Sequence, residues 1–314
     1  MRVFGIGASG FIGRHVVSRL AEQGHDVAVL HRGKTSARLP NGVRGIPGNR
    51  DRLHDSRGDM EAFAPDVVFD AVLYTERQAR DLVTACHGST SQIVALSSAD
   101  VYRNYDGLRG ATTDPPDPVP LSEEAPLRRT RYPYRETDVE FEHAHDYEKI
   151  LVEDVLLNDT DVTSTVLRLP AVYGPGDRQH RVRQYTAQMV DDRRDIVLED
   201  AQADWRWTRG FVVNVAATII AAITSGRSNR GVYNVGDEPT LTEREWVEAI
   251  GAAVGWKGSV VTVSRERILD NRESLDWRYP LWLDTTRIRR ELGYVEQVSL
   301  EVALERSVEW ERAT

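Results

Sequence analysis

The first turn of the chain constrains the fold most, because an apolar run from Arg2 to Ile6 leads directly into the stretch GASGFIG, Gly7 to Gly13. Apolar residues then recur at four-residue spacing before Gly24, at Ile12, Val16 and Leu20. This pattern predicts a strand, a glycine turn and a helix that ends in a glycine cap. Glycines at these three positions allow a tight turn, a close backbone approach to a pyrophosphate and close packing of helix on strand.

The glycine stretch therefore predicts a dinucleotide site in which the pyrophosphate lies on the helix N-terminus. We expect the contacts to come from Gly7, Ser9, Gly10, Phe11, Ile12 and Gly13. A glycine-rich turn without a ligand is the alternative, and the position between a strand and a helix favours the cofactor.

Further strand-like runs alternate with amphipathic helical segments, at Val27 to Leu30, Val67 to Leu73, Ile93 to Leu96 and Thr165 to Leu169. This alternation predicts an α/β fold with a Rossmann-type doubly wound parallel sheet. We expect residues 1–173 to form the dinucleotide-binding domain. Residues 174–314 are expected to form mainly a smaller substrate-binding lobe, with segments that return to the first domain. A loop insertion at 103–135, rich in proline and charge, is predicted to need no packed element.

Composition excludes several classes of protein. Lysine and arginine number 40 against 49 acidic residues, a net charge of −9, so the chain lacks the basic surplus of a nucleic-acid-binding protein. The longest apolar stretch, Val212 to Ile223, is shorter than the ~20 residues needed to cross a bilayer, and we expect a buried helix. No basic-then-apolar leader precedes Val3, so the expected location is the cytoplasm. The single cysteine, Cys86, is expected to be a buried thiol.

The end of the second strand indicates the type of dinucleotide. An NAD site places a carboxylate there for the ribose hydroxyls, whereas this chain reads His31, Arg32, Gly33, Lys34. A guanidinium suits the 2′-phosphate, so the sequence favours NADP over NAD. Asn49 and Arg50, after the presumed third strand, are candidates to border the adenine, with a surface turn as the alternative.

Several later motifs appear in an order that is typical of one family. They are SSADVY at 97–102, LSEEAP at 121–126, RLPAVYGPG at 168–176, VYNVG at 232–236 and DTTRIRRELGY at 284–294. With these motifs the chain resembles the extended short-chain dehydrogenase/reductases, the NAD-dependent epimerase/dehydratase family. The resemblance implies a catalytic serine at Ser98, a lysine at Lys149 that holds the nicotinamide ribose, a cofactor contact at Pro170, and a homodimer formed through paired helices.

The catalytic helix departs from the family pattern, Tyr-x-x-x-Lys followed four residues later by glutamate. Lys149 and Glu153 fit, but the tyrosine position holds His145, and the nearest tyrosine is Tyr147. If the helix has begun there, two residues turn Tyr147 about 200° away from the lysine face, whereas His145 shares that face. An imidazole has a pKa near ~6.5 and is suited to proton transfer. Both residues stay candidates for proton transfer. Structural roles without catalysis are the alternatives: His145 exposed at the surface, Lys149 and Glu153 as a surface ion pair, and Ser98 as an ordinary hydroxyl at the end of a strand.

The substrate end is expected in WRWTRGFVVNVA, residues 205–216. Family members that act on nucleotide sugars have an arginine here that meets the substrate diphosphate, which implies Arg206 or Arg209. The accompanying aspartates are replaced by Gly210 and Asn214, and packing of both arginines at the lobe junction is the alternative. A zinc site at His143 and His145 does not fit, because ligands on one helix face are spaced i, i+4, so no metal is expected.

Together these features predict an NADP-dependent oxidoreductase, epimerase or dehydratase that acts on a carbonyl or hydroxyl of a small molecule, possibly a sugar or a nucleotide sugar. The displaced tyrosine leaves a second hypothesis, an NADP-binding sensor or scaffold protein with reduced catalysis. Neither hypothesis involves nucleic acid, a membrane or a metal as partner.

Overall fold

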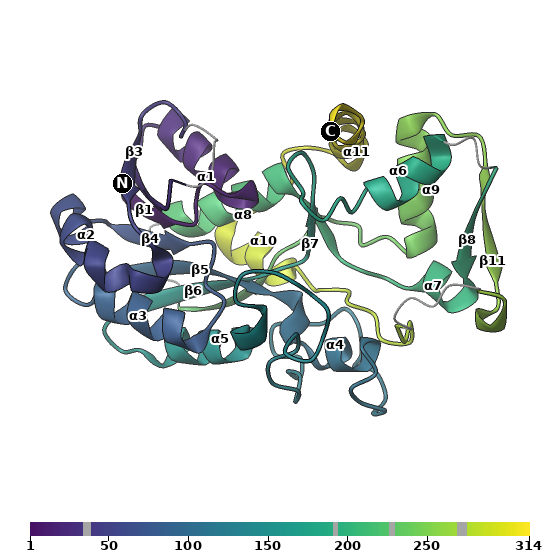
Figure 1. The fold of residues 1–314 in the computed structure, drawn as a ribbon, viewed down its shortest axis with the longest axis horizontal. Coiled ribbons are helices and arrows are strands. Elements are labelled where there is room, and N and C mark those ends of the chain that lie inside the picture. Colours follow the sequence, from purple (N-terminus) through teal and green to yellow (C-terminus); the bar gives the residue numbers. More distant parts are fainter. Residues whose placement is uncertain (34–38, 191–193, 226–229, 269–274) are drawn as a thin grey trace.

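The centre of the protein is a seven-stranded parallel sheet with the strand order β10-β6-β5-β4-β1-β2-β3 (Figure 1). The computed structural model describes residues 1–33, 39–190, 194–225, 230–268 and 275–314, so Lys34 of the basic turn lies outside the described residues. The strands of this sheet are β1 (Arg2–Ile6), β2 (Asp26–His31), β3 (Val43–Pro47), β4 (Val67–Asp70), β5 (Gln92–Ser98), β6 (Thr163–Leu169) and β10 (Gly231–Asn234). The order 3-2-1-4-5-6 confirms the predicted Rossmann-type fold.

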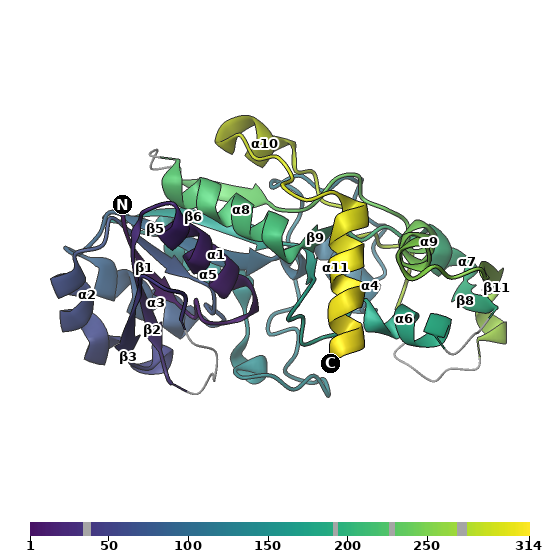
Figure 2. The same ribbon diagram turned by 90° about the horizontal axis from the view of Figure 1, so that it is seen from above.

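Helices cover both faces of the sheet, α1 (Phe11–Glu22) and α8 (Val212–Thr224) on one, and α2 (Arg57–Phe63), α3 (Glu76–Cys86) and α5 (Lys149–Asn158) on the other (Figure 2). Successive strand residues point to opposite faces. Val3 therefore packs in one hydrophobic core with residues of α1 and α8, and Phe4 packs in the other with residues of α2, α3 and α5. The predicted helix at 212–223 is α8, and Cys86 is buried, which raises the pKa of its thiol to about 12.

The structure corrects two predictions, the end of one strand and the content of the insertion. Strand β4 ends at Asp70 and not at Leu73, because the Asp70 carboxylate accepts a hydrogen bond from the backbone N–H of Val72 and turns the chain. The insertion 103–135 was predicted to hold no packed element, which is wrong. It contains the short helix α4 (Arg103–Leu108) and a buried arginine, Arg128.

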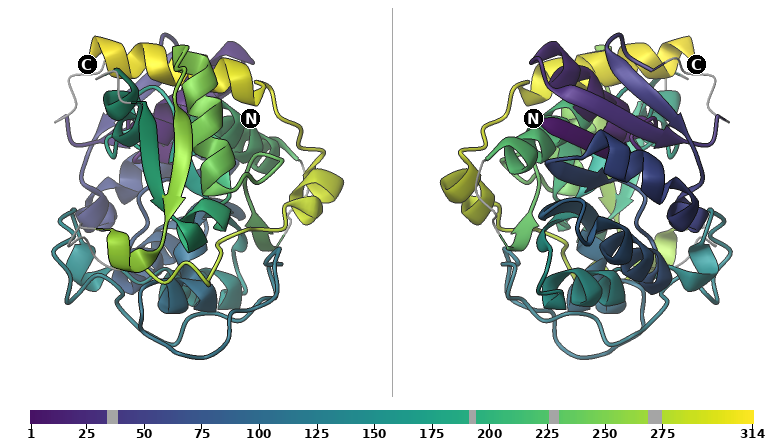
Figure 3. Two further views of the ribbon diagram at one scale, coloured as in Figure 1. Left: turned by 90° about the vertical axis from the view of Figure 1, so that its right-hand side faces the viewer. Right: turned by 90° about the vertical axis from the view of Figure 1, so that its left-hand side faces the viewer.

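The remaining elements lie beside the large sheet. They are β7 (Ala171–Tyr173), α6 (Arg183–Val190), β8 (Asp195–Glu199), α7 (Asp200–Asp204), β9 (Arg209–Phe211), α9 (Glu243–Val254), β11 (Ser259–Val263), α10 (Thr286–Leu292) and α11 (Leu300–Ala313). Strands β8 and β11 pair in parallel and face the viewer in the left view of Figure 3. Helix α11 packs on α9 and α6 and lies between these elements and α8 (Figure 2).

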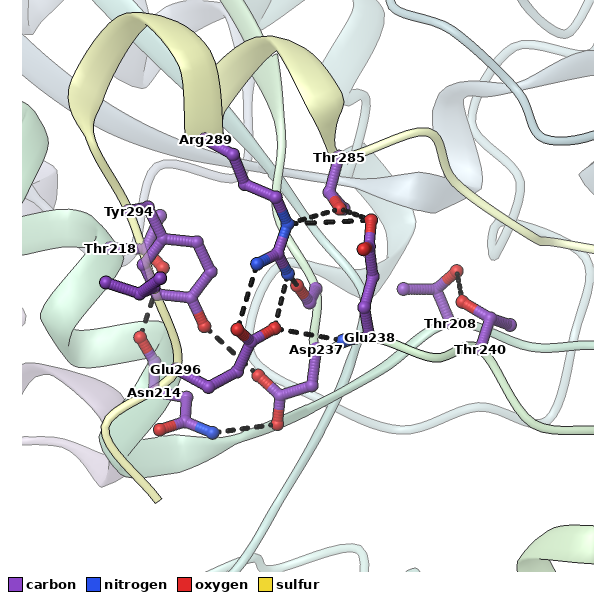
Figure 4. A network of polar contacts seen from close by, with 12 residues as sticks. Thr208, Asn214, Thr218, Asp237, Glu238, Thr240, Thr285, Arg289, Tyr294 and Glu296 are labelled. Carbon is purple, nitrogen blue, oxygen red and sulfur yellow. Dashed lines mark hydrogen bonds and ion pairs between the residues drawn. The ribbon is translucent and has the colours of Figure 1, made fainter. Parts of the chain in front are cut away.

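A polar network after the end of β10 connects α8 with the C-terminal segment (Figure 4). The Asp237 carboxylate accepts hydrogen bonds from the backbone N–H of Phe211 at 2.8 Å, from Asn214 at 3.1 Å and from the Tyr294 hydroxyl at 3.2 Å. The Asn214 side-chain oxygen also accepts from the backbone N–H groups of residues 297 and 298. Asn214 is therefore a buried residue that links α8 to the segment after β10 and to the C-terminal segment.

Among the described residues, the structure contains no helix that is both long and apolar enough to span a membrane.

Candidate functional site

The glycine turn forms an open cradle at the N-terminus of α1. Gly7 has a φ of +67°, and a Cβ atom there would lie 2.4 Å from a methyl group of Val72. A Cβ atom on Gly13 would lie 2.4 Å from the Cα atom of Ala8, so only glycine allows this approach of helix to turn. Gly10 is the N-cap residue, no side chain caps the helix, and its first turn carries no acidic residue. The free N–H groups and the helix dipole at this end suit a pyrophosphate.

The carboxyl ends of the parallel strands form one edge of the sheet, where ligands of such folds bind. This edge carries the glycine turn after β1, Arg32 after β2, Asp51 after β3, Tyr74 after β4 and Ser98 at the end of β5. The cofactor candidates and the catalytic candidates therefore lie along a single edge.

Lys149 is the first residue of α5 and is buried, with 4% of its surface exposed. Its Nζ donates hydrogen bonds to the carbonyl oxygens of Leu73 and Leu96, both at 2.7 Å. An ammonium has three donors, and these two contacts use two of them. Burial lowers the pKa of Lys149 to about 8, against the opposing effect of the Asp100 and Asp70 carboxylates. The surface-pair alternative is excluded, because Glu153 is also buried and forms an ion pair with Arg168 at 2.7 Å.

Tyr147 lies beside this lysine. Its hydroxyl donates to the carboxylate of Asp100 at 2.8 Å, and the nearby Ser98 side chain opposes the rise of the Tyr147 pKa. The Lys149 Nζ lies 5.7 Å from the centre of the Tyr147 ring. Ser98, Tyr147 and Lys149 thus meet in one cluster at the end of β5. The Ser98 hydroxyl also caps the turn that follows the strand, because it accepts from the N–H of Asp100.

The reason for this placement is the point at which α5 begins. Glu148 is the N-cap residue of α5, and its carboxylate accepts from the N–H of Ile150. The same carboxylate pairs with the guanidinium of Arg128 at 2.7 and 2.9 Å, and both side chains are fully buried. Tyr147 therefore stands in extended backbone before the helix, and the helical argument that would turn it away from Lys149 does not apply.

Asp100 and Tyr134 complete the surroundings of the Tyr147 hydroxyl. Tyr134 donates to Asp100 at 3.1 Å and accepts from the hydroxyl of Tyr105 at 3.0 Å. Among the described residues, the Asp100 Oδ1 has no hydrogen-bond partner. Burial raises the pKa of Asp100, and burial next to this carboxylate raises the pKa of Tyr147 well above that of a free tyrosine. Tyr147 therefore keeps its proton in the protein without cofactor.

His145 lies outside this cluster. Its side chain is 71% exposed and contacts the neighbouring carboxylate of Asp146 at 3.0 Å. The short 3-10 turn Ala144–Asp146 ends before α5 begins, so His145 does not share a helix face with Lys149.

The residues predicted to lie near the adenine and its ribose differ in where their side chains point. Asn49 caps the turn after β3 by accepting from the N–H of Asp51. Arg50 points inward, where it forms a buried ion pair with Asp70 at 2.8 Å, so neither a surface turn nor an adenine contact describes its guanidinium. His31 stays at the end of β2, where its ring accepts from the N–H of Gly33.

Arg32 already has a partner. Glu142 binds its guanidinium through two contacts, one of 2.8 Å. Glu142 belongs to residues 132–147, the segment that also carries Tyr147. Phe141, which precedes Glu142, packs edge-on against the rings of Tyr74 and Tyr147, with centroids 6.0 and 5.5 Å away. The segment thus follows the sheet edge from β5 to β2.

The arginines predicted for the substrate side are engaged in packing. Arg209 forms an ion pair with Glu243, and its guanidinium lies 4.4 Å from the ring centre of Trp246. Arg206 donates to the carbonyl of Thr240 and lies 5.3 Å from the ring centre of Trp282. Pro170 is buried between β6 and β7.

One group of possible metal ligands occurs among the described residues, Asp51, Glu142 and His143, whose ligand atoms lie within 4.8 Å of one another. Arg32 holds Glu142, and Gln78 donates to Asp51 at 2.7 Å. Each of the two carboxylates therefore already accepts a hydrogen bond from a protein side chain.

Sequence reasoning did not find Asp100, Tyr134 or Glu142. Asp100 stands inside the SSADVY motif, where a carboxylate among apolar residues was a usable signal. Tyr134 and Glu142 reach the site only through the path of the segment 132–147, which no local pattern reveals.

Comparison with known proteins agrees with this geometry. A family model described as the NAD dependent epimerase/dehydratase family matches residues 6–236. The chain belongs to this family. It is therefore a member of a family of NAD-dependent enzymes, as its motifs predict, and the sensor or scaffold hypothesis is not favoured.

Two curated relatives and one solved structure show how distant the similarity is. The chain is 26% identical over 284 residues to a 2′-dehydrokanamycin reductase from Streptomyces kanamyceticus, a match that covers 88% of this chain and 73% of the relative. It is 32% identical over 148 residues to a dTDP-glucose 4,6-dehydratase from Streptomyces griseus, which covers 46% of this chain and 42% of that protein. A UDP-glucose 4-epimerase from Thermotoga maritima has the same fold, with a TM-score of 0.73, 19% identity and coverage of 100% and 99%.

Proposed function

We propose that this family member is an NADP-dependent reductase of a carbonyl group on a small, sugar-like molecule, and that Tyr147 donates the proton. The observation that carries the proposal is the cluster at the end of β5, in which the Tyr147 hydroxyl donates to Asp100 and lies beside Lys149 and Ser98. The reductase from Streptomyces kanamyceticus supports this substrate class.

In this proposal, different residues along the carboxyl ends of the strands bind the cofactor and transfer the proton. The cradle from Gly7 to Gly13 would hold the pyrophosphate, and the third N–H of Lys149 would hold a ribose hydroxyl. The cofactor, when bound, would supply the hydride for the reduction. Ser98 hydrogen-bonds the reacting oxygen, and Tyr147 passes its proton to that oxygen. Burial keeps Tyr147 protonated in the cofactor-free protein, so its hydroxyl carries the proton that the proposed transfer needs.

The choice of NADP rests on Arg32, since among the described residues the end of β2 carries no carboxylate of its own. The homodimer implied by the family resemblance is a further part of the proposal, which sedimentation would test.

The test is substitution with two readouts. NADPH binding is followed by its fluorescence, and turnover by NADPH absorbance with a panel of aldoses, keto sugars and sugar nucleotides. Tyr147→Phe is expected to keep NADPH affinity and to lose about 10²- to 10⁴-fold in turnover, the range for a general acid. His145→Ala serves as the control and is expected to keep both. Full turnover in Tyr147→Phe, or loss of turnover only in His145→Ala, contradicts the assignment of the proton donor.

A further inference from the structure

One chain segment reaches both ends of the proposed cofactor site. Residues 132–147 begin beside Arg128 and end at Tyr147, next to Lys149. Within this segment, Glu142 extends to the opposite end of the sheet edge and binds Arg32 through both carboxylate oxygens. The contact joins residues 110 positions apart in the sequence. Paired contacts between a guanidinium and a carboxylate fix geometry as well as charge.

The charges around Arg32 oppose a second anion. In the described part of the chain, Arg32 faces the carboxylates of Glu142 and of Asp51, so one positive charge meets two negative ones. His143 contacts Asp51 at 3.2 Å. A 2′-phosphate that approaches Arg32 must therefore replace Glu142 and overcome the charge of Asp51. A dinucleotide with a free 2′-hydroxyl meets no such competition.

The position of Glu142 is fixed by more than this ion pair. Phe141, its neighbour, packs against Tyr74 and Tyr134, with ring centroids 6.0 and 5.5 Å away. His143, on its other side, has a left-handed backbone with a φ of +73° and contacts Gln78 at 3.3 Å. Contacts on both sides thus hold the Glu142 carboxylate at the end of β2 and do not leave it on a free loop.

We propose that Glu142 is a specificity-determining residue for the cofactor, because its pairing with Arg32 competes with a 2′-phosphate and narrows the preference for NADP over NAD. The inference rests on the proposed function, in which Arg32 receives that phosphate. On this inference, a chain with an arginine at the end of β2 would also bind a dinucleotide that lacks the phosphate.

The experiment compares dissociation constants of NADPH and NADH, measured by fluorescence titration of the full chain at low and at moderate salt. The variants are Glu142→Gln, Arg32→Gln and the matched control Glu140→Gln, an exposed glutamate of the same segment. Glu142→Gln is expected to bind NADPH about fivefold to tenfold more tightly, as expected for the loss of one exposed competing ion pair and one like charge. Its NADH affinity and both affinities of Glu140→Gln are expected to stay within twofold of the starting protein. The gain is expected to shrink as salt rises.

The outcomes separate the inference from the proposal beneath it. If Arg32→Gln weakens NADPH while Glu142→Gln leaves it unchanged, the role of Glu142 is wrong and the NADP assignment stands. If Glu142→Gln strengthens NADPH and NADH equally, the residue controls access to the site and not the 2′ position, which also overturns the inference. If Arg32→Gln leaves NADPH affinity unchanged, the NADP assignment itself fails. If neither dinucleotide binds any of the proteins, the proposed function fails.

Discussion

The partly buried carboxylate of Asp237 should make the stability of the protein depend on pH, and Asp237→Asn removes that dependence. Burial raises the pKa of Asp237 to about 6 from 3.8. Asparagine fits the same network in Figure 4. Its oxygen can accept from Phe211 and Asn214, and its NH₂ group can donate to the oxygen of Tyr294.

The sign follows from the raised pKa. Between about pH 4 and pH 6 the folded protein binds more protons at this site than the unfolded chain, so the free energy of unfolding falls as pH rises. The stabilisation that comes from protonated Asp237 is complete below the pKa of this group in the unfolded chain. It is lost above its pKa in the folded protein. A shift from 3.8 to about 6 corresponds to at most about 3 kcal/mol, and we expect about 2 kcal/mol because the side chain keeps some contact with solvent.

The assay is thermal unfolding followed by circular dichroism at pH 4 to 8. The difference in melting temperature between Asp237→Asn and the starting protein should shift in favour of the variant as pH rises. The expected shift across the range is roughly 4 to 8 °C, from the usual 2–4 °C per kcal/mol. Asp161→Asn, an exposed aspartate, is the control and should show a constant difference. A difference between Asp237→Asn and the starting protein that is constant with pH would refute the raised pKa.

Three further substitutions test the cradle, the helix start and the tyrosine cluster. Gly13→Ala should abolish NADPH binding or reduce it at least tenfold, because its Cβ would lie 2.4 Å from the Cα of Ala8; unchanged affinity would contradict the close approach. Arg128→Met should lower the free energy of unfolding by about 3–5 kcal/mol, seen in denaturant melts, because Glu148 is left as an unpaired buried charge. Asp100→Asn should lower turnover about tenfold and alter its pH profile while NADPH affinity holds, whereas an unchanged profile would show a purely structural role.

The parts of the fold that follow from local patterns were predictable from the sequence. Alternating apolar runs identified the strands β1, β2, β5 and β6, and the glycines at 7 and 13 have the close approaches that the motif requires. The ordered motifs also identified the family. These features depend on residues within a few positions of one another, so the sequence displays them directly.

The placement of Tyr147 was not predictable in the same way. Counting back from Lys149 assumed that the helix extends to residue 145, but the helix begins at 149 because the buried Arg128 holds Glu148 in the N-cap position. That contact joins residues 20 positions apart, and Arg128 lies in the insertion 103–135, which was expected to need no packed element. The pairing of Arg32 with Glu142 is hidden for the same reason, since only the folded path of 132–147 joins them.

The start of α5 at Lys149 has a consequence for how such a site can diversify. The residue proposed to anchor the ribose is part of a helix, whereas the residue proposed to donate the proton belongs to the preceding segment 132–147. The two can therefore be altered independently. Changes of length or sequence in 132–147 that keep Glu142 in place would move the proposed acid relative to Lys149, so substrate geometry could change without rebuilding the glycine cradle.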